Sequence, residues 1–169
     1  MTPATLAIAS DFVKTGIERA GVPLTATLEA YLAITFARFI GHSVGVDQLT
    51  VRVTRALDGG APRDAIRALA DECLIACAFF EDRLRRGGPI RHYVGLGQAT
   101  YDAAAMTEQA YGFMHMRDVI ASAAESGPVE APVLIDRARA GSTTARDELD
   151  RQNVVIGPWG GSTRGLIWH

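Results

Sequence analysis

An apolar repeat over residues 62–86 constrains the fold more than any other part of the chain. Its side chains recur at intervals of three and four residues, which is the period of one helix face. Pro62 suits the start of a helix, and Gly87 with Gly88 suits its end. Because residues 73–80 are apolar on every side, we expect a buried central helix over residues 62–86, with Phe80 in the core. The repeat consists of Ile66, Leu69, Cys73, Cys77, Phe80 and Leu84.

Helical patterns in the rest of the chain predict an all-α protein. Thr25 can cap one helix, and Gly21 can end another. Residues 46–57 also alternate like a strand, but Asp47 as a cap and a following Gly-Gly pair favour a helix. We therefore predict a helical bundle of about five to seven helices. The predicted helices cover residues 3–20, 25–40, 46–57, 62–86, 98–124, 131–140 and 144–152.

The chain length predicts one domain. A chain of 169 residues is near the usual size of a single domain, and no linker or repeat divides it. We expect a single helical domain over residues 1–169, in which the helices at 62–86 and 98–124 form an antiparallel pair. Residues 153–169 are predicted to be an irregular tail or a short hairpin of segments 154–156 and 166–168.

Composition narrows the classes of function. The formal net charge of −2 gives no global basic field, so nucleic acid is not expected as the main partner. The start of the chain lacks the pattern of a signal peptide, and the longest apolar run is too short to span a bilayer, which favours a cytoplasmic protein without membrane contact. The four histidines do not stand at metal-ligand spacing, so neither a metal nor a cofactor is predicted.

The first candidate site is the connection at residues 85–101, where basic side chains precede glycines that open a helix. Backbone N–H groups and the positive end of the helix could hold an anionic small molecule there. Arg86, Arg91, His92, Tyr93 and Tyr101 would face such a ligand in a cleft between the two long helices. The alternative is a tight turn between helices whose arginines are solvated.

A second candidate is one face of the helix predicted at 98–124. At about 100° per residue, several polar side chains of this helix fall within one arc, opposite its apolar stripe. A histidine with two carboxylates could act as acid, base or metal ligand, but the simpler prediction is a solvent-exposed face. The arc contains Tyr101, Glu108, Tyr111, His115 and Asp118.

Residues 40–55 carry a third candidate, because their glycines and apolar positions are similar to the turn of a helix-turn-helix. Thr50, Arg52 and Arg55 would then face DNA. The acidic net charge and the long preceding helix count against DNA binding.

Residues 70–101 resemble a group of uncharacterised bacterial proteins of unknown function. The similarity is carried by an order of residues in which an Asp, a Phe-Phe pair and a Leu-Arg-Arg run precede a Tyr, a Gly and a second Tyr. Ala70, Ala78 and His92 depart from the pattern, which has glycines at the first two positions and tyrosine at the third. The resemblance implies an architecture and no activity. The matching residues are Asp71, Leu74, Phe79, Phe80, Leu84, Arg85, Arg86, Tyr93, Gly97 and Tyr101.

The matching polar residues predict an internal network of Asp, Arg and Tyr side chains, since buried polar groups need partners. If part of that network faces a cleft, the ligand-binding residues are Asp71, Arg86, Arg91, His92, Tyr93, Gly97 and Tyr101. No nucleophile and base pair, metal motif or phosphate loop stands out. The sequence therefore favours a non-enzymatic cytoplasmic protein that acts through a protein partner or self-association as a homodimer. Binding of an anionic small molecule at 85–101 is the first alternative, and DNA binding through 40–55 is the second.

Overall fold

The computed structural model describes residues 2–125 and 127–156, and over these residues the protein is all-helical. The described part holds nine helices, more than the predicted five to seven, because two of the predicted long helices are interrupted. The helices are α1 (Pro3–Ala20), α2 (Ala26–Phe39), α3 (Leu49–Asp58), α4 (Arg63–Phe79), α5 (Glu81–Arg85), α6 (Ile90–Ala103), α7 (Thr107–Ala124), α8 (Ala131–Arg139) and α9 (Thr143–Arg151).

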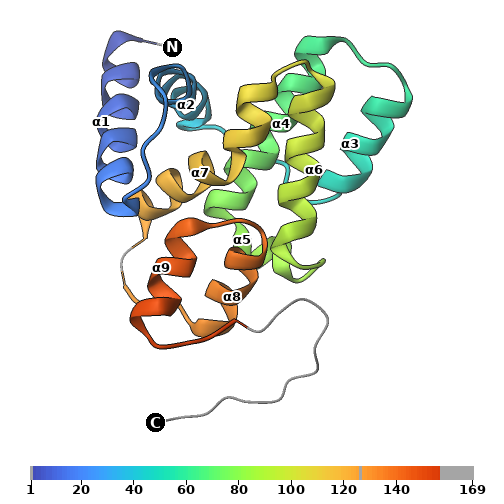
Figure 1. Ribbon diagram of the computed structural model, residues 1–169. Coiled ribbons are helices and arrows are strands. Elements are labelled where there is room, and N and C mark those ends of the chain that lie inside the picture. Colours follow the sequence, from blue (N-terminus) through green and yellow to red (C-terminus); the bar gives the residue numbers. More distant parts are fainter. Residues whose placement is uncertain (1, 126, 157–169) are drawn as a thin grey trace.

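The helices form a bundle around α4 and α7 (Figure 1). Helices α4 and α6 lie side by side, and α3 packs against both of them at one edge. Helix α7 contacts α1, α6 and α4, while α1 pairs with α2 on the other side of the bundle. Helices α8 and α9 form a hairpin at one end of the molecule. None of the helices in the described residues combines the length and apolarity that a bilayer crossing requires.

The middle of α4 is buried, as its apolar run predicts. Cys73 and Cys77 have no exposed surface and are free thiols, and burial raises the pKa of Cys73 to about 12. Helix α7 is just as central, because Phe113, Met116 and Ile120 are fully buried. The centre of the core is thus a pair of crossing helices rather than one strut.

Several helix ends lie where their cap residues predict. The Thr25 hydroxyl accepts the N–H of Leu28 at the start of α2, and Gly21 ends α1 with φ +64°. The predicted cap of α3 is wrong: the N-cap is Gln48, and Asp47 instead pairs with Arg83 of α5. The prediction failed because Asp47 finds a cationic partner from a distant helix.

The predicted helix over residues 62–86 is broken at Phe80. Helix α4 ends at Phe79, and Phe80 joins it to α5 with φ −122° and ψ 27°. This break changes the phase of the following turn, so that Glu81 and Leu84 face the core while Phe80 is 38% exposed. The expected burial of Phe80 is therefore wrong.

The predicted helix over residues 98–124 is also two helices. Helix α6 begins earlier, at Ile90, and ends in a Schellman motif in which Ala105 takes φ +54°. The Met106 N–H donates to the Tyr101 carbonyl and the Ala105 N–H to the Asp102 carbonyl. Arg63 donates from Nε to the Ala104 carbonyl at 2.6 Å, which satisfies another group at this helix end.

The α8–α9 hairpin has a small apolar core of its own. Leu134 and Ala138 of α8 meet Ala145 and Leu149 of α9, and Val154 packs against this group. Residues 154–156 are not in a strand, while residues 166–168 of the predicted hairpin lie outside the described residues. The hairpin packs one apolar residue of its turn, Ala140, against the central apolar cluster, and polar groups occupy much of the boundary between the two.

Candidate functional site: a charged pocket beside the α8–α9 hairpin

Arg117 of α7 carries a positive charge into the interior. Its side chain is 1% exposed, and its three nitrogens all have partners. Nη2 bonds Glu81 of α5, Nη1 donates to Asp118 at 3.0 Å, and Nε donates to the Cys77 carbonyl at 3.1 Å. Two carboxylates and a backbone carbonyl thus use all three nitrogens of this buried guanidinium.

Arg137 of α8 joins the same cluster from the hairpin. Its Nε donates to Glu81 at 2.8 Å, and its Nη2 donates to Glu125 at 2.6 Å. On the other side of Arg117, the Ser142 hydroxyl donates to Asp118 at 2.6 Å and caps α9. Side chains from α5, α7, α8 and the α9 cap therefore meet in one network.

Burial shapes the proton affinities of this network. It raises the pKa of Asp118 above its ordinary value, although Arg117 and Ser142 favour the ionised form. For Arg137, burial works to lower the pKa, but the hydrogen bonds and charges of Glu81 and Glu125 raise it overall. Arg137 is thus held as a cation at the boundary of the hairpin.

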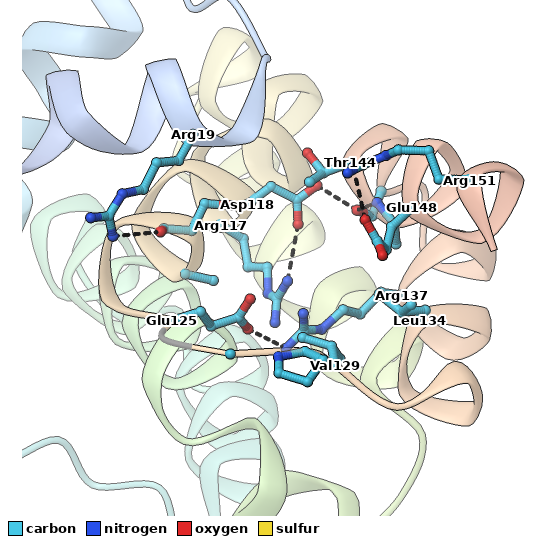
Figure 2. A pocket seen from close by; sticks show the side chains of 16 residues that line it. Arg19, Arg117, Asp118, Glu125, Val129, Leu134, Arg137, Thr144, Glu148 and Arg151 are labelled. Carbon is cyan, nitrogen blue, oxygen red and sulfur yellow. Dashed lines mark hydrogen bonds and ion pairs between the residues drawn. The ribbon is translucent and has the colours of Figure 1, made fainter.

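A pocket of about 290 Å³ opens on this cluster, between the C-terminal end of α7, the end of α1 and the hairpin (Figure 2). Side chains of both charges line it, together with a small apolar wall of Ala121, Val129 and Leu134. The N-terminal end of α9 also borders it at Thr144 and Ala145. The charged lining residues are Arg19, Arg117, Arg137 and Arg151 with Asp118, Glu125 and Glu148.

Two arginines of the lining keep donor capacity. Arg137 is 9% exposed, and within the described residues its Nη1 makes no hydrogen bond. Arg19 donates from Nη1 to the carbonyls of Ser122 and Ala123, and no carboxylate of the described residues pairs with it. An acidic group in the pocket could therefore find donors that the protein itself leaves unused.

The hydroxyl next to the charged cluster has a structural role. Ser142, the hydroxyl closest to a carboxylate here, is both a donor to Asp118 and the helix cap of α9, so it is fixed in a structural role. In the described part of the chain, no three side chains of the metal-ligating types come together. The pocket offers charges and hydrogen bonds to a ligand.

The residues predicted from the sequence lie in three other places. Arg86 and Tyr93 line a groove of about 380 Å³, together with Gln48 and the ion pair of Asp47 with Arg83. This groove lies at the junction of α5 and α6, so part of the predicted region does border an open space.

Asp71, Gly97 and Tyr101 lie in the core instead. Asp71 accepts hydroxyl hydrogen bonds from Tyr101 at 2.7 Å and from Tyr31 at 2.5 Å. A Cβ on Gly97 would come within 2.3 Å of the Phe113 ring, so this glycine allows α6 to approach α7. Burial raises the pKa of Asp71, and burial beside Asp71 raises that of Tyr31 to about 12. These side chains form a closed internal network.

Arg91 and His92 lie on the exposed face of α6. His92 Nε2 is 3.0 Å from the Thr50 hydroxyl of α3, which joins the two helices at the surface. The seven predicted residues are therefore divided between a groove, the core and a surface, and the structure does not bring them together in one cleft.

The connection and packing of residues 40–55 differ from those of a helix-turn-helix. Residues 40–48 connect α2 to α3, where a helix-turn-helix has a turn of about three or four residues. Helix α3 packs on α4 and α6. Arg52 pairs with Glu72 of α4 at 2.7 Å.

The predicted solvent face at 98–124 is wrong for two of its residues. Tyr111 is 85% exposed, but Tyr101 and Asp118 are 0% and 2% exposed. The prediction of one exposed face is wrong here because residues 104–106 break the helix and because neighbouring helices cover most of α7. The i,i+4 pairs of Arg67 with Asp71 and of Glu81 with Arg85 also have buried carboxylates.

Sequence reasoning missed Glu81, Arg117, Glu125 and Arg137. One signal could have found part of the cluster: Arg117 and Asp118 interrupt an apolar stretch of α7, and a charged pair within a core helix needs distant partners. Searches of protein-family models, curated proteins and solved structures found no match to this chain. The resemblance of residues 70–101 therefore stays a prediction.

Proposed function

We propose that the protein binds a small organic acid in the pocket between α7, α1 and the α8–α9 hairpin. The observation that carries this proposal is Arg137, a buried guanidinium that lines the pocket and keeps one nitrogen without a partner in the described residues. Hydrogen bonds from a guanidinium to a carboxylate are strong and directional, so an unused donor on an arginine that lines a pocket favours an acidic ligand. The anionic ligand predicted for 85–101 is thus proposed at a different site.

The test is titration calorimetry with four probes: 4-methylpentanoate, succinate, L-leucine and inorganic phosphate. We expect at least one carboxylate to bind, and Arg137→Lys to weaken that binding about tenfold, because lysine keeps the charge but loses the planar pair of donors. Arg139→Lys on the exposed side of α8 is the matched control and should leave the affinity unchanged. Absence of binding by all four probes at about 10 mM, or equal losses in both variants, would contradict the proposal.

Self-association is a second candidate, and one surface favours it. Phe12, Phe36 and Phe79 form a stack in which the rings of Phe12 and Phe36 are 4.4 Å apart and those of Phe36 and Phe79 are 5.8 Å apart. Phe79 is 38% exposed, and Ile8, one turn before Phe12 on α1, is 63% exposed. An exposed aromatic surface of this kind can pair with a second copy of itself.

Sedimentation of the full chain over a range of concentrations tests this second function. We expect a dimer that Phe79→Ser converts to monomer, while Tyr111→Ser, on another exposed aromatic, leaves the dimer intact. A monomeric wild-type protein at about 100 μM would rule out this interface.

A further inference from the structure

The pocket presents an acceptor beside its unused donor. Glu125 accepts from Arg137 on Oε1, and within the described residues its Oε2 makes no hydrogen bond; its side chain is 35% exposed. Figure 2 shows Glu125 and Arg137 joined at the wall of the pocket. Each of these two bonded groups thus keeps one polar atom with capacity for a ligand: Nη1 of the guanidinium and Oε2 of the carboxylate.

We propose that the ligand is a zwitterion of the α-amino acid class, an inference that rests on the proposed function. The ligand's carboxylate accepts from Nη1 of Arg137, and its ammonium donates to Oε2 of Glu125. Because these two charged groups are attached to one carbon in an α-amino acid, their spacing suits two protein groups that are already bonded to each other. The aliphatic part of the ligand then contacts Ala121, Val129 and Leu134.

The charge balance of the site supports a ligand without net charge. The two buried arginines are already matched, since Glu81 binds both of them and Asp118 binds Arg117. A phosphate dianion would bring negative charge into this network without a free cation deep enough to balance it, and burying such charge is costly. A zwitterion adds one charge of each sign and leaves the balance unchanged.

The test compares L-leucine with molecules that lack one of its charges, using the full chain in low-salt buffer. The probes are 4-methylpentanoate, which lacks the ammonium, 3-methylbutylamine, which lacks the carboxylate, and inorganic phosphate. We expect leucine to bind about tenfold tighter than each of the other three.

Glu125→Gln separates this inference from the proposed function. We expect this variant to lose leucine affinity and the ratio of leucine affinity to 4-methylpentanoate affinity to fall about tenfold, because only leucine has an ammonium to pair with Glu125. Glu130→Gln, at the exposed start of α8, should change neither affinity. The zwitterion proposal is wrong if 4-methylpentanoate or phosphate binds as tightly as leucine, or if Glu125→Gln lowers the affinities for leucine and 4-methylpentanoate equally. Binding of 4-methylpentanoate would in that case still support the proposed binding of an organic acid. If no probe binds, both proposals fail.

Discussion

The two most deeply buried aspartates, Asp71 and Asp118, are the residues whose surroundings are hardest to infer from the chain. Asp71 lies in an apolar helix four residues after Arg67, a spacing that predicts an exposed ion pair. In the structure its carboxylate is 2% exposed and is bonded mainly by Tyr31 and Tyr101, which come from two other helices. The spacing along one helix predicts which side chains are neighbours. The burial of those side chains depends on other helices, which are distant in the sequence.

The raised pKa of Asp71 has a consequence for stability. The folded state holds this proton more tightly than the unfolded state, for which the ordinary value is 3.8. The stabilising contribution is therefore complete below about pH 3.8 and is lost as the pH rises through the folded pKa. Arg38 and Arg67 face the same carboxylate and limit this loss.

Asp71→Asn removes this titration while its amide oxygen can still accept from both tyrosines. As the pH rises from 4 to 7, we expect the free energy of unfolding of wild type to fall relative to that of the variant. The change is about 1.4 kcal/mol for each unit by which the pKa of Asp71 in the folded state exceeds its pKa in the unfolded state. Urea unfolding of both proteins across this range measures the difference. A difference that is constant, or that grows in favour of wild type as the pH rises, would refute the assignment.

At the scale of elements, helices were predictable where a single residue marks their end. Thr25 is a residue type that favours the start of a helix, and Gly21 is one that favours an end. The structure has helix caps at both positions. The turn at Ala105 was not predictable, because alanine favours a helix and rarely adopts a positive φ. The close packing of α6 and α7 requires this turn, and Arg63 of α4 satisfies its carbonyls. Tertiary contacts therefore override local preference at this point.

Two glycines of α6, Gly97 and Gly95, allow a controlled test of how closely this helix packs against α7. A Cβ on Gly97 would lie 2.3 Å from the Phe113 ring and 3.1 Å from the Cys73 Cβ, whereas one on Gly95 would meet nothing within 4 Å. We expect Gly97→Ala to lower the free energy of unfolding by about 1–3 kcal/mol through overpacking. Gly95→Ala should raise it by about 0.5–1 kcal/mol, because alanine favours the helix. Urea unfolding measures both, and equal effects would show that α6 does not approach α7 as described.

For the molecule as a whole, the notable division is between two apolar cores. The large core lies within α1–α7, and the small one lies within the α8–α9 hairpin. Ion pairs connect them: Glu81 binds Arg137, and Arg85 binds Asp136 at 3.0 Å. These partners are separated by 56 and 51 residues in the chain, which is why no local pattern predicted the site. The helices were largely predictable one at a time, but their ionic boundary was not.

Glu81→Gln should disturb this boundary most. It leaves Arg117 and Arg137 buried with one carboxylate fewer, and we expect a loss of about 3–5 kcal/mol in the free energy of unfolding. Hydrogen exchange should also show faster opening of α8 and α9 than of α4. As a control, Glu148→Gln removes a surface partner of Arg151 and should cost under about 1 kcal/mol. Equal losses for the two variants would mean that the cluster does not hold the hairpin.

The ionic boundary also gives the molecule an uneven response to temperature. The cost of removing charged groups from water falls on heating, whereas the gain from burying hydrocarbon reaches a plateau. The seam formed by Glu81, Arg117 and Arg137 should therefore strengthen relative to the two apolar cores as the protein is warmed.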